Sequence, residues 1–296
     1  WELFINSPAA EAAASRVAAA GILLLTLGLV LSFYVAWCLG ANDAANPTEC
    51  AVGSGATTLR QALLLFSVFA AAGALTHGFM VIKTIGKGVV QDVTLLGSVT
   101  IILSACLWIT VCTWRGLPIS TTHSIIGSVL GYGFCHSVLY GGAGVRWGVM
   151  GGIGVAWVTS PILAALLAAF LYRIMLAWLP GMRNPEQVAK RILLFALCFS
   201  AFAFGANDVG NATGVFFSVA SEAGQIPQTL SLLGLGVLGS TGIAVGAFTW
   251  GYKVINTVGF KITRLDYVMG GAAELSNAVA VYLFTTLPFL IFGWGM

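Results

Sequence analysis

The sequence predicts an all-α polytopic membrane protein, and three observations carry that prediction. Of the 296 residues, 58% are hydrophobic and only 8% are charged, whereas a soluble domain carries about 25% charged residues. The mean hydropathy is +0.95. Several apolar runs reach the roughly 20 residues that a helix needs to cross a bilayer. So little charge could not cover a soluble surface, and a net charge of +3 is too small to indicate a nucleic-acid partner.

The apolar runs, taken in order, divide the chain into two halves around a basic connection. In the first half we expect spans over residues 17–39, 61–82, 93–113 and 146–172. Arg173, Arg183, Lys190 and Arg191 then cluster with only Glu186 opposing them. By the positive-inside rule, this connection, 173–191, is predicted to be cytoplasmic. Residues 17–172 and 192–296 are therefore the expected halves, and the second holds apolar runs at 193–204, 230–250 and 278–294.

One polar cluster occurs twice. Residues 40–46 read G-A-N-D-A-A-N, and residues 205–211 read G-A-N-D-V-G-N. Asn and Asp are poor helix formers and are unfavourable in hydrocarbon. An ordinary pair of turns is the alternative explanation, since Asn-Asp is common turn chemistry. The same polar cluster after two apolar runs favours a functional site over two turns.

A second match shows that the halves are related. Residues 81–87 (V-I-K-T-I-G-K) resemble residues 254–260 (V-I-N-T-V-G-F). The offset between the aspartates is 208 − 43 = 165, and the offset between the threonines is 257 − 84 = 173. Two matches in the same order indicate an internal duplication. Such repeats are often inverted in membrane transporters, but hydropathy leaves the number of crossings between them open.

Residues 116–123 read G-L-P-I-S-T-T-H. Pro118 suits the first turn of a helix, so the hydroxyls of Ser120, Thr121 and Thr122 and free backbone N–H groups would meet at its N-terminus, an anion-binding arrangement. The following apolar run, 125–138, is short and interrupted by glycines. That length favours a re-entrant hairpin near 116–140 over a full span. A plain N-cap is the alternative, although it explains one hydroxyl and not three.

These motifs together resemble the inorganic phosphate transporter family of sodium- or proton-coupled carriers, which includes some sulfate permeases. The resemblance rests on the doubled G-A-N-D-x-x-N, the T-[IV]-G segment after each copy, and P-I-S-T-T-H after the first. It covers both halves from about Gly40 onward. It implies two inverted repeats with re-entrant helical hairpins, an elevator-like motion and a homodimer in the cell membrane. It implies no enzymatic activity and no cofactor beyond the coupling ion.

The resemblance also assigns the site residue by residue. Phosphate-binding residues would be Ser120, Thr121, Thr122, Asn42, Asn207, Asp43 and Asp208. Residues that bind Na⁺ would be Asp43, Asp208, Asn46 and Asn211. The sequence departs from the family pattern at 47–50 (P-T-E-C) and at Phe204, where a His is frequent. No second P-x-S-T-T-H occurs before Met296, so we expect the second repeat to be truncated.

Charge supports a coupling ion independently of the resemblance. Phosphate and two ionised aspartates are all anionic, and neither polar cluster contains Lys or Arg. Buried like charges repel, and a buried unpaired charge costs several kcal/mol. Cations or protons must therefore accompany the anion. Na⁺ suits carboxylates, Asn oxygens and the carbonyl groups of an unwound helix, and H⁺ is the open alternative.

Other readings of the sequence remain open. Sulfate is tetrahedral like phosphate and differs mainly in its lack of a proton to donate. A channel would need a continuous polar path, and an enzyme would need a nucleophile with a base; we find neither pattern. The six cysteines show no CxxC and no metal-ligand spacing and are interpreted as small apolar residues. Glu274, alone in the last apolar region, is either a proton or cation site or part of a polar face.

Overall fold

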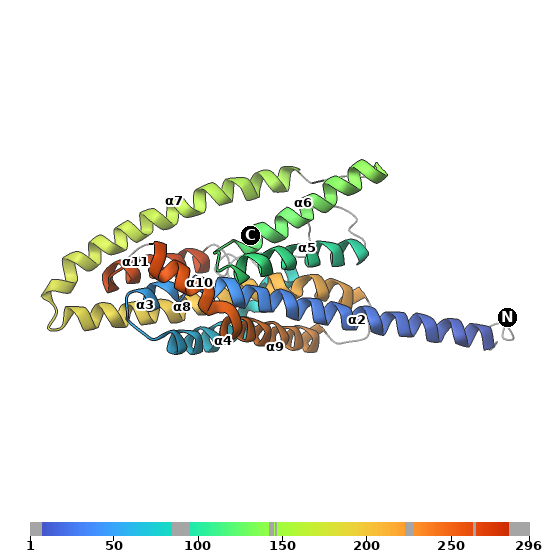
Figure 1. The fold of residues 1–296 in the computed structure, drawn as a ribbon, viewed down its shortest axis with the longest axis horizontal. Coiled ribbons are helices and arrows are strands. Elements are labelled where there is room, and N and C mark those ends of the chain that lie inside the picture. The colour runs from blue at the N-terminus through green and yellow to red at the C-terminus, as the bar shows by residue number, and fades with distance from the viewer. Residues whose placement is uncertain are drawn as a thin grey trace.

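The computed structural model describes residues 8–84, 95–141, 145, 147–222, 228–262 and 265–283, and these residues form a helical assembly (Figure 1). The all-α prediction is confirmed. The first half contains α2 (Pro8–Asp43), α3 (Glu49–Gly53), α4 (Leu59–Thr84), α5 (Leu95–Trp114), α6 (Thr121–Tyr140) and α7 (Trp147–Trp178). After the 3₁₀ turn η2 (Leu179–Gly181) come α8 (Pro185–Glu222), α9 (Gln228–Gly246), α10 (Tyr252–Thr257) and α11 (Tyr267–Val281), with π-helical turns η3 (Ala247–Gly251) and η4 (Val258–Ile262) around α10.

Within the described residues, four helical stretches are long and apolar enough to cross a membrane: Leu59–Phe79, Met150–Gly181, Pro185–Thr213 and Leu232–Ile262. They confirm an integral membrane protein. The spans expected at 17–39, 61–82, 93–113 and 146–172 fall on α2, α4, α5 and α7, although residues 93, 94 and 146 lie outside the described part. In the most apolar window of the α7 stretch only 11% of residues are buried, against 56% for α8. So α8 is a central helix, and α7 lies against the outside.

The core is built where helices of one half cross helices of the other. A Cβ atom placed on Gly40 of α2 would lie 1.8 Å from the carbonyl oxygen of Ile243 in α9. One placed on Gly205 of α8 would lie 1.9 Å from the carbonyl oxygen of Ala70 in α4. These two contacts are the same contact with the halves exchanged, because Gly205 follows Gly40 by 165 positions and Ile243 follows Ala70 by 173. The backbones therefore touch at both crossings, which only glycine permits.

A second pair of glycines repeats the exchange. A Cβ atom on Gly246 of α9 would lie 2.0 Å from the carbonyl oxygen of Trp37, and one on Gly73 of α4 would lie 2.0 Å from that of Phe202. Gly246 follows Gly73 by 173 positions, and Phe202 follows Trp37 by 165 positions, as at the first pair of contacts. At each crossing the two contacts are three positions apart along each helix, so the close approach extends over nearly one helical turn. Figure 1 also shows the equivalent helices α2 and α8 running in opposite directions along the molecule.

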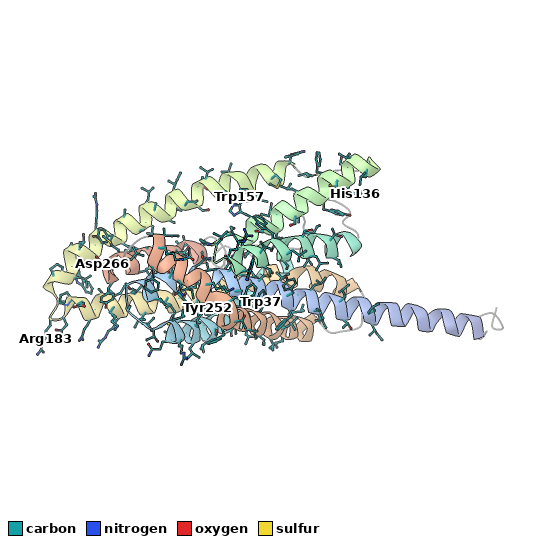
Figure 2. The ribbon with its side chains drawn as sticks, viewed as in Figure 1. Trp37, His136, Trp157, Arg183, Tyr252 and Asp266 are labelled. Atoms are coloured by element: carbon teal, nitrogen blue, oxygen red, sulfur yellow. The ribbon has the colours of Figure 1, made fainter. Side chains whose placement is uncertain are left out.

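The connection between the halves is shorter than predicted. Helix α7 continues through Arg173 to Trp178, and α8 already begins at Pro185. The basic residues of 173–191 are therefore mostly helical, and the non-α-helical link is 179–184. Arg183 lies in this link, at the end of the molecule where α7 turns into α8 (Figure 2). The flanking apolar runs favour helix, so both helices continue into the region that the basic residues alone predict to be a loop.

The segment at 116–140 forms a helical hairpin with the helix before it. Gly116, with φ +68°, turns the chain between α5 and α6. Such a backbone angle is strained for any residue with a Cβ atom. Helix α6 continues through its glycines without a break over 20 residues, and Gly141, at φ +67°, ends it. Whether this hairpin is re-entrant stays a prediction, as does the character of the segment beyond 283, which lies outside the described residues.

The glycine crossings give a stability prediction. Gly73→Ala and Gly246→Ala should each lower the free energy of unfolding by about 1–3 kcal/mol, because the new methyl group would overlap a backbone carbonyl oxygen. The measurement is thermal unfolding of the detergent-solubilised protein. Gly131→Ala on α6 is the control, since nothing lies within 4 Å of its Cβ position. It should be neutral or stabilising by up to about 1 kcal/mol. Equal stability of all three variants would contradict the close-crossing argument.

Candidate functional site

The first polar cluster lies at the end of α2, against the start of α6. Asp43 is the last residue of α2 and is 5% exposed. The hydroxyl group of Thr121, the first residue of α6, donates a hydrogen bond to the Asp43 carboxylate, with Oγ1 2.5 Å from Oδ2. Thr121 is itself buried. Two residues predicted separately from two motifs are therefore in direct contact, 78 positions apart.

Asn42 fixes the loop that carries the hydroxyl residues. Its Nδ2 donates to Thr113 Oγ1 at 2.9 Å and to the carbonyl oxygen of Leu117 at 3.1 Å. Its Oδ1 accepts from the backbone N–H of Ile119 at 3.1 Å. Both amide hydrogens and one oxygen lone pair are thus engaged by the turn between α5 and α6. The side chain that was predicted as a ligand holds the hairpin in place.

The three consecutive hydroxyl groups lie in three different environments. Ser120 is the N-cap of α6 and accepts a hydrogen bond from the backbone N–H of His123 at 3.2 Å. Thr121 faces Asp43, and Thr122 is exposed. Ser120 also lines an open groove of about 600 Å³ together with Trp108, Ile119, His123, Ser124, Gly127 and Ser128. The free N-terminal N–H groups of α6 and these hydroxyl groups make an anion-compatible end of the helix.

The exposed ring of His123 contacts α7 on one side. Its ring centroid lies 4.0 Å from that of Trp157, which Figure 2 labels on α7. The groove is therefore bounded by α6 and α5, with an aromatic side chain of α7 over one of its residues.

The second polar cluster differs from the first, because it lies inside an unbroken helix. Residues 205–211 are helical within α8, whereas the chain leaves α2 at Asp43 and turns through 44–48. Asn211 Nδ2 donates to Asp208 Oδ1 at 3.0 Å, one helical turn away. Asp208 and Asn207 are half-buried, and Asn46 is exposed. The Asp208 carboxylate is near enough for its charge to act on Asp43.

The site is anionic and has no basic partner in the described part of the chain. The side chains that interact with the Asp43 carboxyl group, by charge or by a hydrogen bond, are Asp208, Thr121 and Cys38. Asn211 forms a hydrogen bond with Asp208, and no Lys or Arg is among these side chains. Two neighbouring carboxylates in a region of low dielectric repel each other. The arrangement therefore favours a cation or a proton at the aspartates.

Thr113 is a residue of the site that the sequence did not reveal. It is completely buried; its hydroxyl group accepts from Asn42 and donates to the carbonyl oxygen of Ile109 at 2.8 Å. It stands in an apolar helix with no motif around it. Only its contact with Asn42, 71 positions away, identifies it.

Comparison with known proteins gives consistent similarities. The sequence profile of the phosphate transporter family matches residues 39–191 and 180–289. A protein of Pyrococcus horikoshii named as a candidate phosphate permease is 32% identical over 342 aligned positions, which cover 88% of this chain and 82% of the relative. The chloroplastic inorganic phosphate transporter 2-1 of Arabidopsis thaliana is 29% identical, over 87% of this chain and 61% of its own. A solved structure of a sodium-dependent phosphate transporter superposes with a TM-score of 0.74 at 28% identity, over 88% of this chain and 84% of that one.

The Asn42 contacts give a prediction that concerns structure alone. Asn42→Asp replaces the two amide donors by a carboxylate that faces the Leu117 carbonyl oxygen. We expect a loss of about 1–3 kcal/mol in unfolding free energy and faster amide hydrogen exchange over residues 116–121. Asn46→Asp makes the same chemical change at an exposed position and should leave both measurements unchanged. Unaltered exchange in the Asn42 variant would show that the loop is held by other contacts.

Proposed function

We propose, from the premise that this chain belongs to the phosphate transporter family, that it takes up inorganic phosphate by symport with Na⁺. The family membership rests on the profile match over more than half of the chain. It is a family of carriers and not of enzymes. Coupling to Na⁺ is supported by the likeness to a sodium-dependent transporter of known structure and by the chemistry of the site.

The observation that carries the proposal is the contact between Asp43 and Thr121, beside Asp208. It joins the anionic cluster to the helix end that suits an anion. With no Lys or Arg acting on either aspartate among the described residues, phosphate would meet two like charges. Bound Na⁺ between the carboxylates and the phosphate removes this repulsion. The empty site then binds phosphate poorly, and uptake draws on the sodium gradient.

The proposed ligands divide by chemistry. Asp43, Asp208, Asn46 and Asn211 supply oxygen atoms for Na⁺. Ser120, Thr121, Thr122 and Asn207 supply donors for phosphate, together with the first N–H groups of α6. Asp43 and Asp208 contact phosphate through the cations. Asn42 serves phosphate by positioning the α5–α6 loop, since its amide is engaged there.

We further propose that the two halves are inverted repeats with the site at their interface. The exchange of contacts between the Gly40 and Gly205 crossings supports a two-fold relation. The opposite directions of α2 and α8 support a two-fold axis that runs perpendicular to these helices (Figure 1). In transporters built this way the substrate lies near the bilayer midplane, where the repeats meet. Asp43 and Asp208 each belong to one half.

A homodimer in the cell membrane completes the proposal. The outward face of α7 carries exposed apolar residues, among them Val155, Val158, Ile162, Leu166 and Phe170. Lipid or a second copy of the chain can cover such a face. The molar mass of the detergent-solubilised protein, after subtraction of the bound detergent, distinguishes one copy from two.

Uptake of radiolabelled phosphate into proteoliposomes tests the function. We expect uptake that requires an inward Na⁺ gradient and is insensitive to excess unlabelled sulfate. Uptake that follows an inward H⁺ gradient without Na⁺ would replace Na⁺ coupling by proton coupling at the same aspartates. Suppression by sulfate, with little phosphate transported, would make sulfate the substrate.

Substitution of Asp43 tests the role of the carboxylate. Asp43→Asn keeps an oxygen that can accept from Thr121 but removes the charge that attracts Na⁺. Sodium-dependent uptake should fall on the order of tenfold, because coupling between two bound ligands is typically worth 1–3 kcal/mol. Asp266→Asn is the matched control, since Asp266 is the exposed N-cap of α11 and Asn caps helices equally well. Unchanged uptake with an unchanged sodium dependence in the Asp43 variant would exclude this role.

A further inference from the structure

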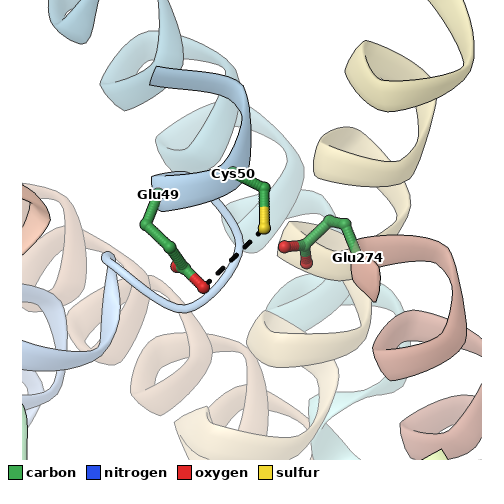
Figure 3. Close-up of side chains that lie close together, drawn as sticks. All are labelled: Glu49, Cys50 and Glu274. Carbon is green, nitrogen blue, oxygen red and sulfur yellow. Dashed lines mark hydrogen bonds between the residues drawn. The ribbon is translucent and has the colours of Figure 1, made fainter. Parts of the chain in front are cut away.

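Three side chains with metal-binding donors converge away from the two polar clusters. Glu49 and Cys50 begin α3, and Glu274 lies in α11. Each offers one ligand atom, and these atoms all lie within 4.8 Å of one another. Figure 3 shows the three side chains directed toward a common point between the two helices. Among the described residues this is the one such group of three or more His, Cys, Asp or Glu side chains.

The backbone holds the cluster together through glycine contacts. Gly270, one turn before Glu274, packs on Cys50, and a Cβ atom on Gly270 would lie 3.3 Å from that of Cys50. At the other end of α3, a Cβ atom on Gly53 would lie 2.3 Å from the carbonyl oxygen of Gly259 in η4. Helix α3 is therefore fixed between α11 and η4. The donors are brought together by packing before any ligand arrives.

One oxygen atom of each carboxyl group in this cluster lacks a hydrogen-bond partner among the described residues. Glu274 is 2% exposed, and its Oε1 atom has no hydrogen-bond partner among the described residues. The Oε2 atom of Glu49 is likewise buried and unpaired. The Cys50 thiol donates weakly to Glu49 Oε1 at 4.0 Å. A buried polar atom without a partner costs roughly 1–3 kcal/mol, and more if it is charged, so the cluster is incomplete as a purely structural feature.

The surroundings supply no compensating charge. Glu274 forms hydrogen bonds with Ser200, Cys50 and Asn277, which are all uncharged. The side chain whose charge affects Glu49 is Glu274 itself. No Lys or Arg from the described elements around the cluster is among them. A bound cation would supply the positive charge that the two carboxyl groups and the thiol lack around them.

We propose that Glu49, Cys50 and Glu274 bind a divalent transition-metal ion of the Zn²⁺ class. Zinc accepts thiolate sulfur and carboxylate oxygen together, at about 2.3 Å and 2.0–2.2 Å. A tetrahedral ion with those bond lengths needs ligand atoms about 3.3–3.8 Å apart. The present spacing, with 4.0 Å between Cys50 Sγ and Glu49 Oε1, closes to that by small side-chain rotations. Water takes the fourth position.

Hard cations fit these donors less well. Ca²⁺ takes six to eight oxygen ligands, and Mg²⁺ demands an octahedron of oxygens, whereas here three donors include a sulfur. Soft thiolate ligands select zinc and its neighbours. Two carboxylates and a thiolate carry three negative charges, and a divalent ion offsets more of that charge than Na⁺ does. The bound ion would link α3, which follows the Asp43 turn, to α11. This site is separate from phosphate uptake, and its test measures metal binding alone.

The first measurement is the absorption spectrum of the purified full chain loaded with Co²⁺ as a probe for Zn²⁺. We expect one equivalent of Co²⁺, a sulfur-to-metal charge-transfer band, and displacement of both by Zn²⁺. Equilibrium dialysis should give one Zn²⁺ per chain. Cys50→Ser should abolish the charge-transfer band and weaken Zn²⁺ binding by at least about tenfold, since even partners outside the ligand shell affect affinity by 10–100-fold. Glu274→Gln should weaken binding similarly.

Cys135→Ser and Glu186→Gln are the controls, because both residues are exposed and lie outside the cluster. They should bind Zn²⁺ like the unaltered chain. Stoichiometric binding that survives Cys50→Ser would overturn the proposed ligand set. Absence of Zn²⁺ binding, with a protonated buried carboxyl group in the infrared spectrum, would replace the metal by a proton shared between Glu49 and Glu274. The cobalt spectrum needs no variant, so a poorly folding mutant would not prevent the decision.

Discussion

The backbone contact at the glycine crossings is the constraint on which the rest of the structure depends. Helix α2 meets α9 at Gly40, and α8 meets α4 at Gly205, with no room for a methyl group at either place. In a bilayer the hydrophobic effect does not drive helices together, so close packing of small residues must. These contacts join the two halves of the chain, and they also determine where the two polar clusters lie.

The G-A-N-D pattern has a direct physical explanation in this geometry. Residues three positions apart lie on the same face of a helix. Asp43 comes three positions after Gly40, and Asp208 comes three positions after Gly205. A glycine that admits the crossing helix therefore sets the following aspartate on the face that meets the other half. Two copies of the pattern bring two carboxylates toward one another, and the hairpin anchored by Asn42 presents Thr121 to the first of them.

Much of this architecture could be predicted from the sequence, because apolar length and small-residue patterns are local. The spans at α4, α5 and α7, the duplication and the hairpin after Gly116 all carried such signals. The continuation of α7 through Arg173 carried no such signal, since a charged residue near the end of a helix does not stop the helix. The contacts of Asn42 with Thr113, and of Glu274 with Glu49 and Cys50, join residues far apart in the chain. The spacing of Cys50 to other donors in the sequence is uninformative, so the sequence predicts only a small apolar residue there.

The two halves are alike in sequence but differ in the backbone conformation around their aspartates. Around Asp208 every backbone rotation is tied to the hydrogen-bond ladder of α8, and moving one residue would break helical bonds worth about 0.5–1.5 kcal/mol each. Around Asp43 the chain has left its helix and continues in hydrogen-bonded turns, in which the backbone N–H of Asn46 donates to the Asp43 carbonyl oxygen at 3.0 Å and that of Thr48 to the Ala45 carbonyl oxygen at 2.9 Å. The two aspartates therefore have different supports, a continuous helix for Asp208 and a helix end followed by turns for Asp43. A change at Asp208 is therefore transmitted along the length of α8, whereas a change at Asp43 reaches only the end of α2 and the turn that leads to α3.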